Sequence, residues 1–307
     1  MDASPKADVN KATETSRLWN TSIPGIELFE AKLLHHRFGK HFHEGYTIGF
    51  NESGQGQCLH QGRVHTHYPN SFNCINPGAV HTGEVAAKSG WAFRNLYLSI
   101  PLVQQVLTQL NSSDQQLPCF PRIVVKNSLL KPQFYQLFQA LSQPASQLKR
   151  EALLLQFLAS LFGQEAQFST QVSPNRSLGH VPVAKESKAI SITRSYLQTH
   201  CTKDISIHQL AQQANLNPHY LIRCFRQQVG ISPHRYKQHW QLLKAKQALA
   251  SDESLAAIAA EHGFYDQSHF TRAFKRTFGL PPGRYRTLNK PQKVSFLQDR
   301  PSPPAKH

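Results

Sequence analysis

The alternation of apolar and polar positions divides this chain into an amino-terminal part that predicts strands and a carboxy-terminal part that predicts helices. From Glu27 to about Ile100, short apolar runs are separated by Gly, Pro and Asn. Short strands with frequent turns are typical of a small barrel or jelly roll. The candidate strands are Leu28–His35, Tyr46–Asn51, Gln55–His60, Arg63–His67, Ser71–Ile75 and Phe93–Ser99.

Two helices are predicted after the strands. Ser128–Ser142 and Gln147–Phe162 both place apolar residues at i, i+3, i+4 and i+7. The apolar surface of the second helix is wide enough to cover the barrel and also to meet a second subunit, and the pattern leaves both interpretations open. One stripe on it consists of Leu148, Ala152, Leu155, Ala159 and Phe162, and Leu154, Leu158 and Leu161 widen it.

Three segments lack such periodicity. Residues 1–22 are polar with mixed charge, residues 164–185 are dominated by Gln, Ser, Pro, Asn and Gly, and residues 289–307 are rich in Pro and Lys. We expect two disordered tails and, between them, a linker. The 307 residues then divide into one domain at 23–163 and another at 186–288, and the fold class is α+β multidomain.

The second domain contains one sequence pattern twice. The first copy ends at Tyr236 and the second, about 48 residues later, ends at Tyr285. Each copy has a small residue where two helices would cross and, four positions later, a residue that tolerates positive φ, as a helix-turn-helix requires. These residues are Ala211 and Asn215 in the first copy and Ala259 and Gly263 in the second. One copy alone could be a protein-packing hairpin, but two aligned copies favour DNA binding.

The second helix of each copy should turn a polar edge outward. Leu221 with Phe225, and Phe270 with Phe274, form the inward apolar edges at i and i+4. An outward arginine can bond guanine bidentately, which is worth about 1–3 kcal/mol of base discrimination, and lysines hold phosphates. The outward residues are His219, Ile222, Arg223 and Arg226 in the first copy and Gln267, Ser268, Thr271, Arg272, Lys275 and Arg276 in the second.

Charge and cysteine content agree with a DNA-binding protein of the cytoplasm. The net charge is +16, and residues 185–290 hold 16 Lys and Arg against 6 Asp and Glu, which favours a polyanionic partner such as double-stranded DNA. The five cysteines are widely spaced and form no CxxC pair, which argues against a disulfide framework or a zinc knuckle. The chain shows no signal-peptide pattern and no apolar run that could span a membrane.

The repeated segment resembles the AraC/XylS family of transcription regulators over residues 189–286, and the second copy from Gly263 onward carries the family pattern nearly intact. The resemblance implies an all-α domain with two helix-turn-helix units joined by one helix. It also implies activation of transcription, a homodimer and contact with RNA polymerase. The amino-terminal domain resembles, more weakly, the family's cupin-type sensor, which binds a small effector. The family's base-reading positions carry over to His219, Ile222, Arg223, Gln267, Ser268, Thr271 and Arg272.

Histidines in the barrel suggest a binding site. His41 and His43 stand at i and i+2, so they point to one side of a strand, and His81 from a later strand could converge on them. We expect an organic effector, bound without metal or other cofactor. The residues expected to contact it are His41, His43, Tyr46, His81, Trp91 and Asn95.

Two alternatives stay open for the barrel. His41, His43 and His81 resemble the histidines of metal-binding cupins and could hold Fe, Ni or Zn, as in a metal-dependent enzyme or a metal sensor. The glutamate that metal cupins place after the second histidine is absent, because Thr47 and Ile48 stand there. The barrel could also serve dimerisation alone. No nucleophile elbow, P-loop or dinucleotide motif occurs, so we predict no catalytic residue and no enzyme activity.

Overall fold

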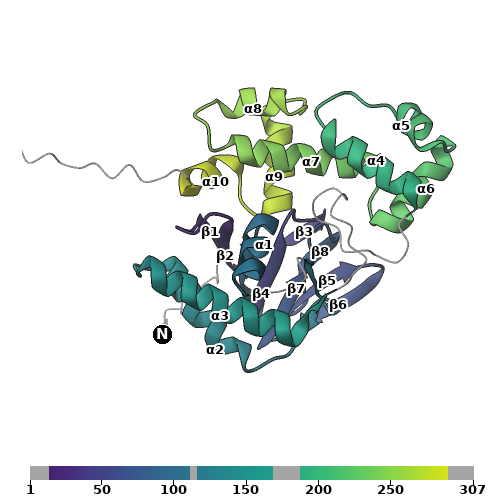
Figure 1. Ribbon diagram of the computed structural model, residues 1–307. Helices are drawn as coiled ribbons and strands as arrows, with labels where there is room; N and C mark the ends of the chain where they lie inside the picture. Colours follow the sequence, from purple (N-terminus) through teal and green to yellow (C-terminus); the bar gives the residue numbers. More distant parts are fainter. Residues whose placement is uncertain (1–13, 111–115, 169–186, 290–307) are drawn as a thin grey trace, which may run out of the picture.

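The computed structural model describes residues 14–110, 116–168 and 187–289. A β-rich amino-terminal domain lies against an all-helical carboxy-terminal domain (Figure 1). The linker expected at 164–185 and the tail expected at 289–307 fall mostly outside the described residues. None of the helices within the described ranges is long and apolar enough to cross a membrane.

The amino-terminal domain is built from two antiparallel sheets with the strand orders β1-β2-β9-β4-β7-β11 and β3-β8-β5-β6. Of three short strands, β11 pairs with β7, and β10 and β12 pair with each other. The six strands predicted from sequence are confirmed within a few residues. The strands are β1 (Thr15–Asn20), β2 (Ile26–Leu33), β3 (Arg37–His41), β4 (Tyr46–Gly54), β5 (Gly56–His60), β6 (Arg63–His67), β7 (Ser71–Ile75), β8 (His81–Val85), β9 (Trp91–Leu98), β10 (Pro118–Cys119), β11 (Val124–Val125) and β12 (Gln167–Phe168).

The first strand corrects the prediction of a disordered tail at residues 1–22. Thr15–Asn20 pairs with β2 along its whole length. Leu18 is buried in a cluster that includes helices of the carboxy-terminal domain, and Trp19 meets Phe138 edge-on at 5.9 Å. The segment is polar in composition, so its sequence does not predict a strand. Its two apolar residues, Leu18 and Trp19, pack against parts of the chain that are distant in sequence.

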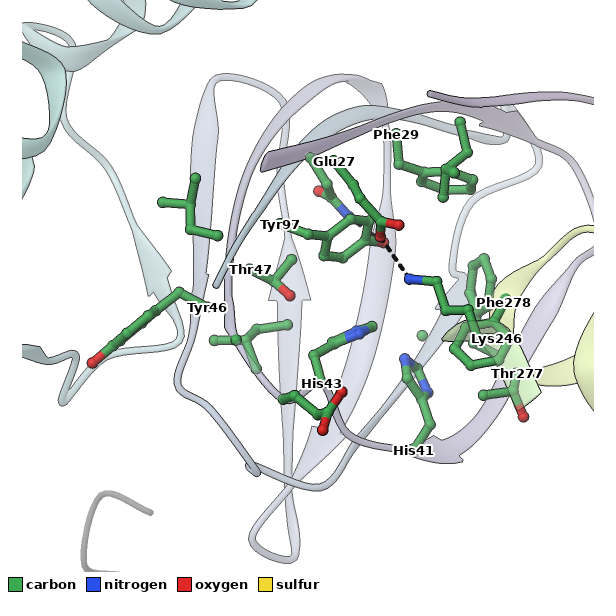
Figure 2. Close-up of a pocket in the computed structure, with 18 of the residues that line it drawn as sticks. Glu27, Phe29, His41, His43, Tyr46, Thr47, Tyr97, Lys246, Thr277 and Phe278 are labelled. Atoms are coloured by element: carbon green, nitrogen blue, oxygen red, sulfur yellow. Dashed lines mark hydrogen bonds and ion pairs between the residues drawn. The ribbon is translucent and has the colours of Figure 1, made fainter. Parts of the chain in front are cut away.

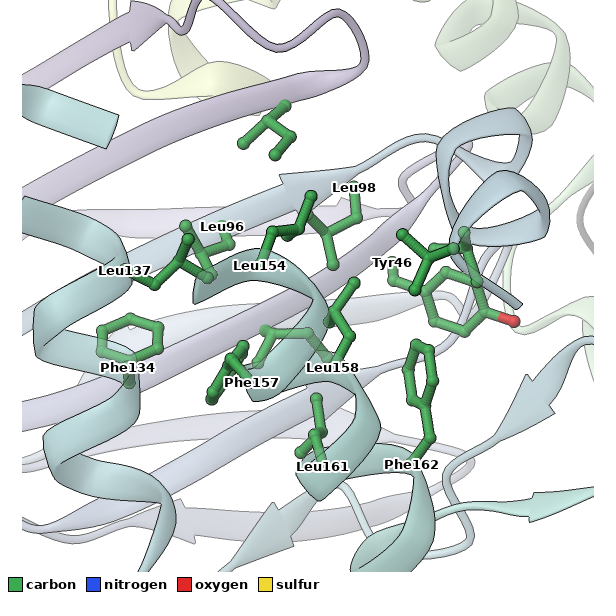
Figure 3. Close-up of a cluster of buried hydrophobic side chains, with 14 of the residues drawn as sticks. Tyr46, Leu96, Leu98, Phe134, Leu137, Leu154, Phe157, Leu158, Leu161 and Phe162 are labelled. Atoms are coloured by element: carbon green, nitrogen blue, oxygen red, sulfur yellow. The ribbon is translucent and has the colours of Figure 1, made fainter. Parts of the chain in front are cut away.

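Three helices pack buried apolar side chains against the larger sheet. Figure 3 shows Leu137 and Leu154, from two of these helices, beside Leu96 of the sheet. These helices are α1 (Ile100–Gln109), α2 (Leu130–Ser142) and α3 (Gln147–Glu165). The wide apolar surface predicted on α3 divides between core and exterior, because Leu154, Leu158 and Leu161, together with Phe162, are buried in the core. At the amino-terminal end of the same surface, Leu148 is 77% exposed, and Ala152 and Ala159 are also exposed.

The carboxy-terminal domain has the predicted two helix-turn-helix units. Asn215 ends the first helix of its unit with φ of 50°, in the left-handed region, and Gly263 takes the same role with φ of 75°. The reading helices begin at the predicted caps, because Asn217 accepts from the His219 amide and Asp266 from the His269 amide. The helices are α4 (Lys188–Thr199), α5 (Ile207–Ala214), α6 (Pro218–Val229), α7 (Pro233–Ala248), α8 (Leu255–Glu261), α9 (Gln267–Phe278) and α10 (Pro282–Asn289).

The two domains share buried apolar side chains. Phe29 and Phe93 of the larger sheet belong to the same cluster as Phe274 and Tyr285 of the second helix-turn-helix unit. Phe42, just after β3, belongs instead to the core of the first unit. Each unit therefore has a separate apolar contact with the barrel.

Candidate effector cavity and DNA-reading surface

A cavity of about 470 Å³ lies in the amino-terminal domain and is bordered on one side by the carboxy-terminal domain. Both sheets contribute to its wall, together with residues from α7, α9 and α10 (Figure 2). A volume of this size suits a small organic molecule. Its aromatic lining includes Phe29, Phe38, Trp91, Phe93, Tyr97, Phe278 and Tyr285.

Three histidines meet at this cavity. His41 ends β3 and faces His81 of β8 directly in the antiparallel register, and their ring centroids are 4.3 Å apart. The ring of His43 lies 5.0 Å from that of His41 and 5.3 Å from that of His81. One ligating nitrogen from each of the three lies within 4.8 Å of the other two. The convergence predicted from sequence is therefore present.

The main chain determines which nitrogen of two rings is free. His41 Nδ1 lies 2.7 Å from the Gly39 carbonyl oxygen, and His81 Nδ1 lies 2.9 Å from the Ala79 carbonyl oxygen. A carbonyl oxygen can only accept, so each Nδ1 carries the proton and each Nε2 keeps a lone pair. Burial lowers the pKa of His41 to about 4 and lowers those of His43 and His81 well below the usual value, so all three rings are neutral near pH 7.

The cavity wall also contains unpaired polar atoms. Among the described residues that line it, Thr47 Oγ1, His67 Nδ1 and Asn73 Oδ1 are buried without a hydrogen-bond partner in the protein. These residues are 1%, 2% and 5% exposed. Buried polar groups are costly unless they are hydrogen-bonded, so a ligand with polar groups of its own would be favoured here.

An ion pair crosses from the barrel to the DNA-binding domain at this cavity (Figure 2). Lys246 Nζ of α7 donates to Glu27 Oε2 of β2 at 2.6 Å, and the Tyr285 hydroxyl of α10 donates to Glu27 Oε1 at 2.6 Å. Burial alone would raise the pKa of Glu27, but the charge and hydrogen bond of Lys246, with the bond from Tyr285, bring this pKa below its usual value. Glu27 is therefore ionised at neutral pH.

All six predicted pocket residues border the cavity, but one of them turns its side chain elsewhere. The ring of Tyr46 points away from the cavity (Figure 2), and its hydroxyl donates to the Pro118 carbonyl oxygen at 2.7 Å. It belongs to the core beneath α2 and α3, because alternate residues of β4 face opposite sides of the sheet. His41, His43, His81, Trp91 and Asn95 do line the cavity.

Several residues of this site carry no signal in the sequence. Glu27, His67 and Tyr97 stand on strands of ordinary composition, and Lys246 stands on the helix that joins the two units. No local signal marks Lys246, because its role depends on how α7 docks against the barrel.

The ten candidate DNA-reading residues lie on the outer faces of α6 and α9. All are exposed except Thr271, which is half-buried. Leu221, Phe225, Phe270 and Phe274 face inward and are fully buried, as the i, i+4 pattern predicts. Arg223 lies over the Tyr220 ring at 5.2 Å, which holds its guanidinium close to the surface of α6.

Comparison with known proteins gives a consistent result for both domains. Residues 23–158 match the family model for an AraC-like ligand binding domain, and residues 210–287 match a helix-turn-helix domain. The chain is 26% identical over 244 residues to the HTH-type transcriptional regulator YbfI of Bacillus subtilis, covering 80% of this chain and 85% of YbfI. It is 27% identical over 265 residues to the transcriptional activator RhaS of Escherichia coli, covering 82% and 89%.

Solved structures share the fold at low identity. ToxT of Vibrio cholerae matches with a TM-score of 0.54 at 10% identity, over 91% of this chain and 99% of ToxT. A second ToxT structure, with an unsaturated fatty acid bound, matches with a TM-score of 0.55 at 12% identity, over 90% and 95%. The arrangement of a sheet domain followed by two helix-turn-helix units is thus a known one.

Proposed function

This chain belongs to the AraC family of transcription regulators, with a ligand-binding domain and a helix-turn-helix DNA-binding domain, and from that premise we propose that a small molecule in the cavity controls how its two reading helices meet DNA. The observation that carries the proposal is the composition of the cavity wall. Leu243, Lys246 and Gln247 of α7 border the cavity, and α7 is the helix that joins the two units. A ligand that moves α7 changes the spacing of the readers.

The effector is expected to be a small organic molecule with polar groups. The aromatic wall suits an apolar part of it, and the unpaired atoms of Thr47, His67 and Asn73 suit hydroxyl, carbonyl or amide groups. Occupancy next to Lys246 would strengthen or break its bond to Glu27, and so bias the contact between the domains.

On the DNA side, Arg223 and Arg272 are assigned to base edges, together with His219, Ile222, Gln267, Ser268 and Thr271. Arg226, Lys275 and Arg276 are assigned to phosphates. The exposure of these residues on the outer faces of two similar units supports contact with DNA, and the division between bases and phosphates follows the chemistry of the side chains. Insertion of both helices into the major groove would follow the usual geometry of helix-turn-helix proteins.

Several further properties complete the proposal. We assign the sensor to residues 23–163 and the reader to residues 186–288, and we infer a cytoplasmic homodimer that activates transcription through RNA polymerase. The exposed apolar stripe of Leu148, Ala152 and Ala159 on α3 supports a subunit contact. We also infer no catalytic activity. Cys58 lines the cavity, but burial raises the pKa of its thiol to about 12, so it is protonated.

The test uses the full chain and DNA selected from a random pool by repeated binding. Affinity for the selected DNA is then measured with and without each member of a panel of small polar and amphipathic molecules, including an unsaturated fatty acid. We expect at least one to change affinity in the wild type but not in a Thr47→Val, Asn73→Leu double variant. Failure to select any DNA would refute the reader assignment, and ligand binding without any effect on DNA affinity would refute the control mechanism.

A further inference from the structure

We propose that His41, His43 and His81 bind one divalent transition-metal ion, of the kind exemplified by Zn²⁺ and Fe²⁺, with an open coordination position directed into the cavity. All three side chains line the cavity, and their ligating nitrogens are within 4.8 Å of one another. Imidazole is a good ligand for zinc, iron, nickel and copper, and three protein ligands leave room for a fourth from solvent or effector.

The hydrogen bonds of the rings fit this role. In metal sites, a ligating histidine usually donates its other ring N–H to a carbonyl or carboxylate, which orients the ring. His41 and His81 each do so through Nδ1, to the carbonyl oxygens of Gly39 and Ala79, two residues earlier in the chain. The free nitrogen is then Nε2 in both rings, and the antiparallel pairing of the two residues holds them opposite each other.

The distances need only a small adjustment. A tetrahedral zinc site with Zn–N bonds of about 2.0–2.1 Å places its nitrogens about 3.4 Å apart. The present separations are at most 4.8 Å, so closing the site shortens any one of them by at most about 1.4 Å. His239, also buried nearby, is excluded as a ligand through Nε2, because that nitrogen lies 2.6 Å from the Phe42 carbonyl oxygen and must donate to it.

The metal would sit at the point where the barrel meets the first helix-turn-helix unit. Phe42, between two of the ligands, is 1% exposed and stacks on Tyr236 of α7 with centroids 5.1 Å apart. Its ring also lies 4.2 Å from that of His239. Closing His41 and His43 around an ion would therefore act on the segment that anchors α7. This consequence rests on the proposed function, whereas the metal site itself does not.

The site is tested first by metal binding alone. The untagged full chain is stripped with chelator and titrated with Zn²⁺ by calorimetry, with metal content checked by mass spectrometry and coordination by the visible absorption of the Co²⁺ form. We expect one ion per chain. The variants His41→Gln and His81→Gln should each weaken binding at least about 100-fold, since even a lost second-shell partner costs 10–100-fold. His65→Gln, on β6 outside the cluster, should bind as the wild type does.

Circular dichroism establishes that each variant is folded before titration. A wild-type chain that binds no Zn²⁺ or Co²⁺ would overturn the proposal, and so would binding that survives in both cluster variants. The coupling is tested separately with Phe42→Leu, which should keep one ion per chain but lose at least half of any metal-dependent change in DNA affinity. If metal changes the DNA affinity of Phe42→Leu and of the wild type equally, the proposed coupling through Phe42 is refuted, whereas the metal site itself is not.

Discussion

Lys246 lies on the helix that joins the two DNA-reading units, and its ammonium group donates to the carboxylate of Glu27 in the barrel at 2.6 Å. The two residues are 219 positions apart in the chain. The side chains are 20% and 22% exposed, so the pair is neither deeply buried nor freely solvated. Because Lys246 and Glu27 both line the cavity, we expect a bound ligand to affect the contact between the domains.

Removing the lysine should destabilise the contact between the domains. In Lys246→Met, the partly buried Glu27 carboxylate loses the cation that donates to it and keeps the hydrogen bond from the Tyr285 hydroxyl, and we expect a loss of about 1–2 kcal/mol in the free energy of unfolding. Urea denaturation of the full chain measures this loss. Lys32→Met, at an exposed position of the same β2 strand, is the control and should change stability by less than about 0.5 kcal/mol.

The same pair predicts a dependence on acid. The pKa of Glu27 is lower in the folded protein than the ordinary value of 4.5, so its stabilising effect is complete above that value and is lost as the pH falls through the lowered pKa. Lys246 and the hydroxyl of Tyr285 both donate to this carboxylate. We expect the stability difference between the wild type and Glu27→Gln to be constant from pH 7 to about pH 5 and to shrink below it. A difference that changes between pH 6 and pH 7 would contradict the assignment.

Single substitutions should distinguish residues that read bases from residues that bind phosphates. Arg272→Ala should weaken binding to the selected DNA by about 1–3 kcal/mol while leaving non-specific binding nearly unchanged. Lys275→Ala should weaken both by similar factors and reduce the slope of affinity against salt by about 1. Fluorescence anisotropy at several salt concentrations distinguishes the two outcomes. If Arg272→Ala weakens binding to the selected DNA and to non-specific DNA equally, Arg272 contacts phosphate and does not read a base.

The turn of the first unit gives a matched pair of variants. Asn215 is in the left-handed region at φ of 50°, where a Cβ without a local polar group costs about 1–2 kcal/mol. Asn215→Ala should therefore lower the midpoint of thermal unfolding, and Asn215→Gly should leave it unchanged or raise it slightly. A similar effect of both substitutions would show that the Asn215 side chain, not its backbone conformation, matters.

Local sequence was sufficient for the DNA-binding units. The small residue at the helix crossing, the left-handed turn residue and the polar caps all act within about ten positions of one another, so spacing alone identifies them. The period of the helix decides which positions face inward and which face outward. Leu221 and Phe270 are accordingly buried, and Arg223 and Arg272 are exposed.

The barrel was predicted less completely. β3 has the sequence RFGKH, in which only the last residue is buried, and it becomes a strand because β8 pairs with it. Tyr46 borders the cavity but turns its ring to the core, which the sequence does not show, because a shift of one residue along β4 exchanges the two faces of the sheet.

By itself, the sequence determined the two-domain order, the helix-turn-helix pair and the possibility that His41, His43 and His81 converge. Only the tertiary structure decided that Lys246, Phe278 and Tyr285 line the cavity. The reason is physical: a helix turn or a cap is specified by neighbours within a few residues, whereas a cavity wall depends on apolar burial between segments that are hundreds of positions apart and leave no periodic trace in either one.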